Sequence, residues 1–230
     1  MRVLKGLIGA LLLPACVGVT LTIYGLLLQL SGGTWRGWSP DVWALLGGFG
    51  LWILIYFVMP RPMRTYVLAH ELTHALWAWL MGGSVVGMKV SKRGGHVLLT
   101  KSNFLITLAP YFFPFYTLCV LAIHAVTSLF FDTSPYEAVW LAWIGLTWGF
   151  HLTFTLSMIK VGQSDIREHG ALFSYVIIYS FNLLGIGIWL VAVSDLTWTE
   201  WTHALGHDVS HVYQRLGEWL MEAVHWIAKA

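Results

Sequence analysis

The chain has 230 residues, of which 57% are hydrophobic and only 10% carry a charge. Soluble domains carry about 25% charged residues, so this composition indicates an integral membrane protein with several spans. The formal net charge of +2, without a block of basic residues, argues against a nucleic-acid-binding protein.

Six apolar stretches are long enough to cross a bilayer as helices, which takes about 20 residues. They lie at about 6–30, 42–59, 65–81, 104–131, 137–158 and 171–193. The first stretch is longer than the apolar core of a signal peptide, about 7–15 residues, so we expect it to be retained. Pro110 and Pro114 should kink the fourth span, because proline interrupts the hydrogen bonds of a helix.

The third span contains His70-Glu71-Leu72-Thr73-His74, an H-E-x-x-H motif. On a helix, His70 and His74 leave the same face one turn apart, which suits two ligands of one tetrahedral zinc ion. Glu71 lies about 100° around the helix from His70, where it can take a proton from a water on the metal. Ionisable groups inside a membrane span are costly and indicate a functional site. The alternative is a buried histidine pair bonded to backbone carbonyls.

The stretch that follows the third span, residues 82–101, has the composition of strands. Apolar residues flank Lys92-Arg93-Gly94-Gly95, which is a typical turn sequence, and we expect a small β-hairpin at about 84–100. A lone hairpin is only marginally stable, so it should lean on the membrane part. Its free edge could bind an extended substrate as an added strand. An irregular loop is the alternative.

A site built on H-E-x-x-H needs a third protein ligand from a distant part of the chain. The candidates are Asp165, Glu168, His169 and His151. Because successive spans alternate in direction, residues 160–170 should lie on the same side of the membrane as the hairpin. We favour Asp165, which requires residues 162–166 to enter the protein, and Gly162 permits such an irregular backbone. The alternative is an interfacial loop with a solvated Asp165.

Residues 197–229 predict an amphipathic helix that lies at the membrane surface. Its histidines, His203, His207 and His211, recur every four residues and would form the wet face. Asp208 stands where the zinc motif has glutamate, but its side chain is shorter and the tail lacks a deep pocket, so we expect no catalysis there. A regulatory metal site or a pH sensor is the alternative for these histidines.

The motif, the hairpin and the late aspartate together resemble the site-2 protease class of intramembrane zinc metalloproteases, over about residues 65–185. In that class the aspartate is commonly followed by glycine, whereas Ile166 follows it here. The apolar stretches, the hairpin and the tail predict an all-α polytopic membrane protein with about six transmembrane helices, a small β-hairpin after the third and a C-terminal amphipathic helix. Residues 1–195 would form the membrane-embedded protease domain, and 196–230 the amphipathic helix.

The resemblance also implies the activity. The chain would be a zinc metalloendopeptidase that hydrolyses peptide bonds in or near the transmembrane segments of membrane-protein substrates. His70, His74 and Asp165 would hold Zn²⁺, and Glu71 would be the general base and then the proton donor to the leaving amine. Its partners would be a transmembrane protein or peptide substrate and the lipid bilayer. We expect a multi-pass protein of the plasma (inner) membrane.

Two other functions stay open from the sequence. A non-catalytic metal-binding membrane protein or a metal carrier could use the same histidines as ion ligands, although carriers commonly contain internal repeats and none is recognisable here. A membrane zinc hydrolase that acts on a non-peptide bond is the other possibility. The residues that would bind the substrate are not identified by any motif.

Overall fold

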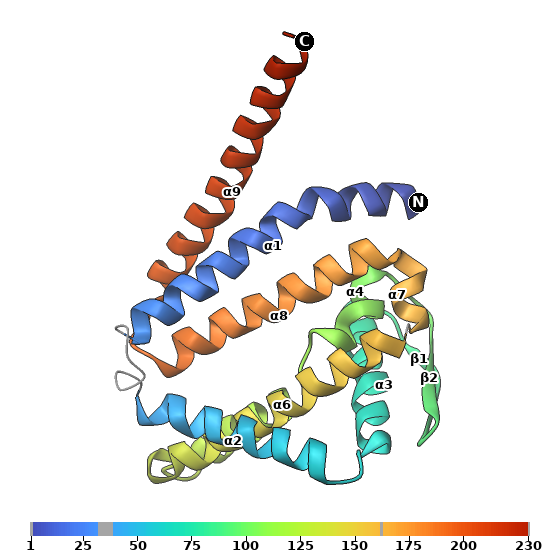
Figure 1. The fold of residues 1–230 in the computed structure, drawn as a ribbon. Helices are drawn as coiled ribbons and strands as arrows, with labels where there is room; N and C mark the ends of the chain where they lie inside the picture. The colour runs from blue at the N-terminus through green and yellow to red at the C-terminus, as the bar shows by residue number, and fades with distance from the viewer. Residues whose placement is uncertain (1, 32–38, 162, 230) are drawn as a thin grey trace. The chain divides into compact units, whose positions relative to one another are not determined.

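The structure, a computed structural model, describes residues 2–31, 39–161 and 163–229 (Figure 1). This part of the chain is mostly helical with one two-stranded antiparallel hairpin, which confirms the predicted helical fold class and its small hairpin. The chain divides into two compact units. Pro40–His169 forms the central unit, and Met1–Ser39 together with Gly170–Ala230 forms the terminal unit.

The central unit carries the H-E-x-x-H motif and the hairpin. Its elements in chain order are α2 (Pro40–Val58), α3 (Met63–Leu80), β1 (Val85–Ser91), β2 (Gly94–Leu99), α4 (Phe104–Leu108), the 3-10 turn η2 (Ala109–Tyr111), α5 (Phe115–Ser128), the 3-10 turn η3 (Ser134–Tyr136), α6 (Glu137–Val161) and α7 (Ser164–His169). The terminal unit contains long helices. They are α1 (Arg2–Ser31), α8 (Ala171–Val193) and α9 (Trp198–Ile227).

Within the described ranges, four helical segments are long and apolar enough to cross a membrane, and they indicate a membrane protein. These are α1, α2, α6 with the adjoining η3, and α8. The bent pair of α4–η2 and α5 would make a fifth if it counted as one span. The prediction of six is thus met only in part. α3 is helical as expected but is not among the four, because Arg64 and the ionisable residues of the motif make it less apolar.

The predicted fourth span is broken rather than kinked. Asn103 caps the start of α4, where its side-chain oxygen accepts a hydrogen bond from the Ile106 N–H at 2.9 Å. Pro110 lies in η2 and Pro114 directly precedes α5, and the two helical pieces meet at 81°. Each proline lacks a backbone N–H and its ring blocks the preceding helical turn, so two of them four residues apart end one helical piece and start another.

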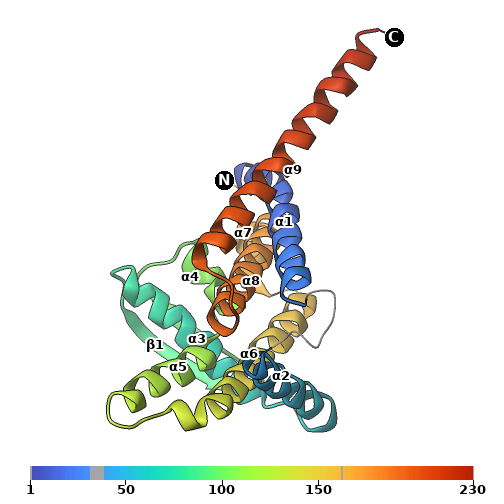
Figure 2. The same cartoon turned by 90° about the vertical axis from the view of Figure 1, so that its left-hand side faces the viewer.

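Close packing of α2 on α6 depends on glycine. A Cβ atom on Gly48 would collide with the backbone of Ala142, and one on Gly145 would collide with the backbone of Leu45. An aromatic cluster then ties this helix pair to α3, and the rings of Tyr66 and Phe154 stack with their centroids 4.7 Å apart. Its aromatic members are Trp52, Tyr56, Tyr66, Phe150 and Phe154, and Val67 packs with them. Figure 2 shows α2 and α6 side by side.

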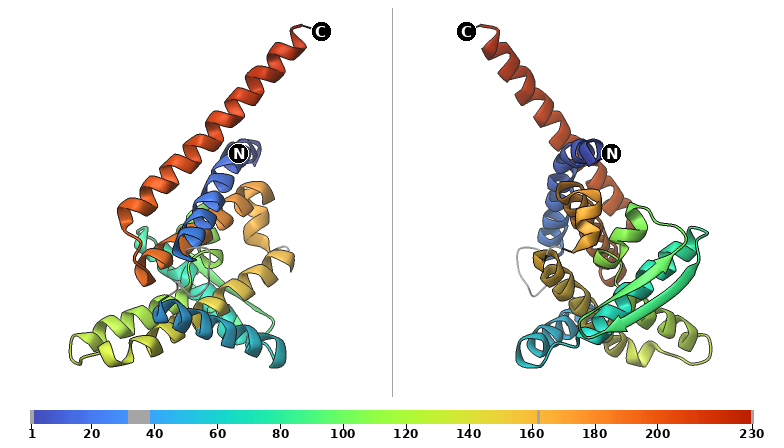
Figure 3. Two further views of the ribbon diagram at one scale, coloured as in Figure 1. Left: turned by 60° about the vertical axis from the view of Figure 1, so that its left-hand side comes forward. Right: turned by 90° about the vertical axis from the view of Figure 1, so that its right-hand side faces the viewer.

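The hairpin lies along α3, as the right-hand view of Figure 3 shows. Its strands pair in antiparallel register, with Lys89 opposite His96 and Val90 opposite Gly95. Gly94 begins β2 with a φ of 136°, a conformation that favours glycine, so the turn falls where the sequence predicts it. The hairpin packs on α3, whereas its predicted support by the membrane part stays a prediction, because α3 is not among the four apolar segments.

In the terminal unit, α1 packs against α8 and α9. The first half of α9 is held by polar contacts to α1, where Thr22 Oγ1 donates to Asp208 Oδ2 at 2.9 Å and the Tyr213 hydroxyl donates to the Leu11 carbonyl at 2.6 Å. From Tyr213 onward every described residue of the helix is exposed. The predicted C-terminal helix is therefore present, but the inner face of its first half packs on protein, a contact that its apolar pattern alone did not reveal.

Candidate metal centre

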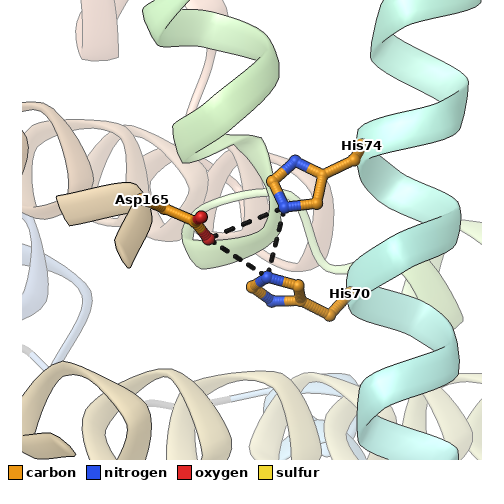
Figure 4. Close-up of side chains that lie close together, drawn as sticks. All are labelled: His70, His74 and Asp165. Atoms are coloured by element: carbon orange, nitrogen blue, oxygen red, sulfur yellow. Dashed lines mark hydrogen bonds and ion pairs between the residues drawn. The ribbon is translucent and has the colours of Figure 1, made fainter. Parts of the chain in front are cut away.

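The two motif histidines leave the same face of α3, one turn apart, as their spacing predicts (Figure 4). Their rings lie edge to face with centroids 4.8 Å apart, and their Nε2 atoms are 3.2 Å apart. His74 is buried and His70 nearly so. Both Nε2 atoms point away from the helix toward the same place.

Asp165 approaches that place from α7. Its Oδ2 atom is 3.3 Å from His70 Nε2 and 3.6 Å from His74 Nε2 (Figure 4). In the part of the chain that the structure describes, these three side chains form the one cluster of three or more groups able to hold a metal ion. A segment 95 residues away in sequence from His70 thus supplies the third donor.

The spacing of the donor atoms fits a tetrahedral metal. Zinc bonds of about 2.0–2.1 Å place neighbouring ligand atoms of a tetrahedron about 3.3 Å apart. The three separations in the cluster are 3.2, 3.3 and 3.6 Å. Two imidazole nitrogens and one carboxylate oxygen are also a ligand set that catalytic zinc sites use, with the fourth position open.

The outer nitrogen of each imidazole has its own partner. His74 Nδ1 donates to the backbone carbonyl of Ile106 at 2.8 Å, and His70 Nδ1 is 3.2 Å from the hydroxyl of Tyr66. A carbonyl can only accept, so the Nδ1 of His74 must carry a proton, and a neutral His74 then presents a lone pair on Nε2. Outer contacts of this kind orient histidines as metal ligands.

Three acceptor atoms that converge in this way repel one another unless a cation lies among them. A proton on one of the histidines can supply this positive charge. Burial opposes ionisation of Asp165, but hydrogen bonds from His70 and His74 outweigh burial and hold the pKa of that carboxyl well below its usual range. A divalent metal ion would instead bind all three donor atoms at once. The cluster therefore favours a bound positive charge, either a proton or a metal ion.

Glu71 lies beside the cluster on the face of α3 that meets the hairpin. Its side chain is buried, with 5% of its surface exposed, and it lines the same cavity as the three donors. The cavity has a volume of about 710 Å³, which lies within the range of ligand pockets, about 300–1,000 Å³. Its walls come from α3, β2, α4, the end of α6 and α7. A carboxylate thus faces the space next to the donor cluster.

The other candidates for the third ligand do not join the cluster. His151 lies on α6 and lines a separate cavity of about 20 Å³. Glu168 lines the edge of the large cavity with a mostly exposed side chain, 3.9 Å from the buried His169. Asp165 reaches the cluster, but residues 164–166 begin the helix α7, so the irregular backbone predicted for 162–166 is not found in these three residues. Gly162, to which we assigned the irregular backbone, lies outside the described residues.

The histidine stripe of α9 is exposed, as predicted. His203, His207 and His211 all have exposed side chains, and the rings of His207 and His211 stack in parallel 6.1 Å apart. His207 Nδ1 lies 3.0 Å from Asp208 Oδ1. Within the described ranges no third donor approaches them closely enough to form a metal cluster.

Three contributors to the centre were missed in the sequence, namely Tyr66, Ile106 and Tyr111. Tyr66 precedes His70 by four residues on the same helix face, so the helical period could have indicated it. Tyr111 ends η2, just before the break in the predicted fourth span, and its hydroxyl donates to Asp165 Oδ2 at 3.0 Å. No local pattern signals this contact, and Ile106 contributes only its backbone carbonyl.

Comparison of the chain with known proteins gave no match, whether with family models, curated proteins or solved structures.

Proposed function

We propose that this chain is an integral membrane zinc endopeptidase, similar to site-2 proteases, that cleaves peptide bonds in or near the transmembrane segments of its substrates. Its proposed location is the plasma (inner) membrane. The single observation that carries the proposal is the convergence of His70, His74 and Asp165 on one point beside Glu71. Membrane-spanning helices elsewhere in the chain support a substrate that is itself embedded in lipid.

His70, His74 and Asp165 would hold the zinc ion. When bound, zinc polarises a substrate carbonyl and acidifies water at that position. The outer hydrogen bonds of the histidines, to Ile106 and Tyr66, keep the two rings aimed at the metal.

Glu71 would act as the general base and then as the general acid. It takes a proton as water oxygen bonds to the carbonyl carbon of the scissile peptide. It then gives that proton to the amide nitrogen as the C–N bond breaks, which leaves a carboxylate end and an amine end. Its position on the wall of the same cavity as the three donors supports this role, because a general base must lie within reach of the reacting groups.

The cavity supports an extended substrate. β2 contributes a continuous run, Gly94–Leu99, to its wall. A helical substrate has its backbone groups already paired, so it must unwind before attack, and the unwound segment loses those hydrogen bonds. A strand of the hairpin can replace them by pairing with the substrate backbone.

The test compares wild type with Glu71→Gln and the matched control Glu137→Gln, an exposed residue at the start of α6. The full chain, purified in detergent, is incubated with a panel of single-span peptides, and its zinc content is measured. We expect Glu71→Gln to keep its zinc and to lose about 10²–10⁴-fold in cleavage rate, the typical contribution of a general base. Glu137→Gln should cleave like wild type.

Two results would contradict the proposal. If the purified wild-type protein contains no zinc, the proposed metal centre is wrong. Zinc-loaded wild type that cleaves no peptide faster than Glu71→Gln would favour the alternative, a non-catalytic metal-binding protein or a metal carrier.

A further inference from the structure

The side chain of Tyr111 meets the donor cluster from outside α3 and α7. It ends η2, and its exposed fraction is 0%. Its ring stands edge to face against His70, with centroids 5.4 Å apart, and its hydroxyl donates to Asp165 Oδ2 at 3.0 Å. One buried residue thus touches two of the three donors.

Asp165 depends on such a contact more than the histidines do. His70 and His74 are fixed by one continuous helix, whereas Asp165 lies on α7, which has six residues. Among the described residues, its Oδ1 atom accepts one hydrogen bond, a long and exposed one from Ser164 Oγ at 3.4 Å. From a buried position, the Tyr111 hydroxyl donates to Oδ2, the same atom that faces both histidines.

The segment that carries Tyr111 is itself well anchored. The side-chain hydroxyl of Thr155 on α6 donates to the Tyr111 carbonyl at 3.4 Å. Ile106, Leu108 and Ala109, which precede Tyr111, are almost completely buried. The Ile106 carbonyl accepts from His74 Nδ1, so the same short segment also orients a second donor. The break in the predicted fourth span therefore creates a rigid support beside the cluster.

We propose that Tyr111 is a positioning residue whose hydroxyl holds Asp165 in place as the third metal ligand. This inference rests on the proposed zinc centre. The phenol donates one hydrogen bond and leaves the second lone pair of Oδ2 directed at the metal. Loss of outer contacts to metal ligands typically weakens metal binding about 10–100-fold.

The experiment removes one oxygen atom at a time. Tyr111→Phe and the matched control Tyr116→Phe are made in the full chain; the Tyr116 hydroxyl donates to the Thr65 carbonyl at 2.8 Å, away from the cluster. Zinc affinity is measured by chelator competition, and the absorption spectrum of bound Co²⁺ reports the ligand geometry. We expect Tyr111→Phe to bind zinc about 10–100-fold more weakly with an altered Co²⁺ spectrum. Tyr116→Phe should match wild type in both.

A double-mutant cycle separates positioning from a general loss of structure. If Tyr111 acts through Asp165, Tyr111→Phe should change zinc affinity by less than about twofold in a chain that already carries Asp165→Ala. Fully additive effects of the two substitutions would overturn the inference, as would equal affinity of Tyr111→Phe and wild type. In both cases wild type still binds zinc, so the proposed function stands. Wild type that binds no zinc is a different result and removes the proposed function itself.

Discussion

Gly95 of β2 lies directly against the carboxylate of Glu71. A Cβ atom on Gly95 would lie 2.8 Å from Glu71 Oε1 and 2.6 Å from Val67 Cγ1, closer than side chains normally approach. The hairpin backbone therefore reaches the proposed general base only because residue 95 has no side chain. This contact links the turn of the hairpin to the chemistry proposed for α3.

Gly95→Ala should impair the function of Glu71 without removing the metal. The new methyl group must push the Glu71 carboxylate aside or lift the hairpin from α3, since Lys89 O lies 2.8 Å away on the other side. We expect the cleavage rate to fall by about tenfold or more, because a small misplacement of a catalytic group is costly. Zinc content should equal that of wild type.

The matched control for this prediction is Gly87→Ala on the neighbouring strand. A Cβ there would meet only Leu98 Cδ1, at 3.9 Å, which is an ordinary contact. Cleavage by Gly87→Ala should stay near the wild-type rate. If both variants cleave like wild type, the hairpin does not position Glu71.

Asp165→Ala should weaken zinc binding more than any change to an outer contact. It removes one of three donor atoms, whereas outer contacts typically contribute about 10–100-fold. Glu168→Ala, three residues further along α7, is the control, because its side chain is mostly exposed and lies outside the cluster. Chelator competition on both variants measures the difference. Equal zinc affinities would assign the third ligand elsewhere.

Some residues of this site can be predicted from local sequence spacing, whereas others depend on contacts between distant segments. The spacing of His70 and His74 fixes their common face as soon as α3 is helical, so local pattern sufficed. Asp165 required topology, because only the alternating direction of the helices placed residues 160–170 near the hairpin. Tyr111 could not be predicted, since its contact to Asp165 depends on the 81° break between two helices.

The fold shows the same division between local and long-range information. Lys92-Arg93-Gly94-Gly95 predicts the hairpin turn correctly, because its glycine at a φ of 136° is a local requirement. Of the six predicted spans, four are met within the described residues and the bent pair would make a fifth, whereas α3 carries the costly polar residues that build the site and is not apolar enough to count by composition. The packing of α9 on α1 was also missed, because an apolar helix face does not say whether protein or lipid covers it.

Gly48→Ala should destabilise the central unit. The added methyl group meets the backbone of Ala142 on α6, which cannot move away as a flexible side chain would. Overpacking of this kind costs about 1–3 kcal/mol. Thermal unfolding in detergent measures it, and Gly47→Ala is the control, because a Cβ at Gly47 has no neighbour within 4 Å. Identical melting temperatures for the two variants would contradict the close helix approach.

The first turn of α9 should depend on pH through Glu200. Hydrogen bonds from the backbone N–H and the hydroxyl of Thr197 lower the pKa of this carboxyl in the folded helix. A lowered folded-state pKa means that ionised Glu200 stabilises the turn above the ordinary glutamate pKa of about 4.3. That stabilisation is lost as the pH falls through the folded-state pKa.

Hydrogen exchange of the first turn of α9 checks this prediction. Protection should decrease as the pH is lowered through that range, after correction for the intrinsic exchange rate. Glu200→Gln should abolish the dependence, whereas Glu222→Gln, on the exposed second half of the helix, should keep it. The same dependence in wild type and Glu200→Gln would show that the capping box of Thr197 and Glu200 is not its source.

The most direct test of the central claim is X-ray absorption spectroscopy at the zinc edge on the purified full chain. The account predicts one zinc per chain, with scattering from two imidazoles and a carboxylate oxygen at about 2.0–2.2 Å. His74→Ala should remove one imidazole from that spectrum or remove the zinc altogether. A zinc-free wild-type protein, or a zinc spectrum without imidazole scattering, would contradict the account.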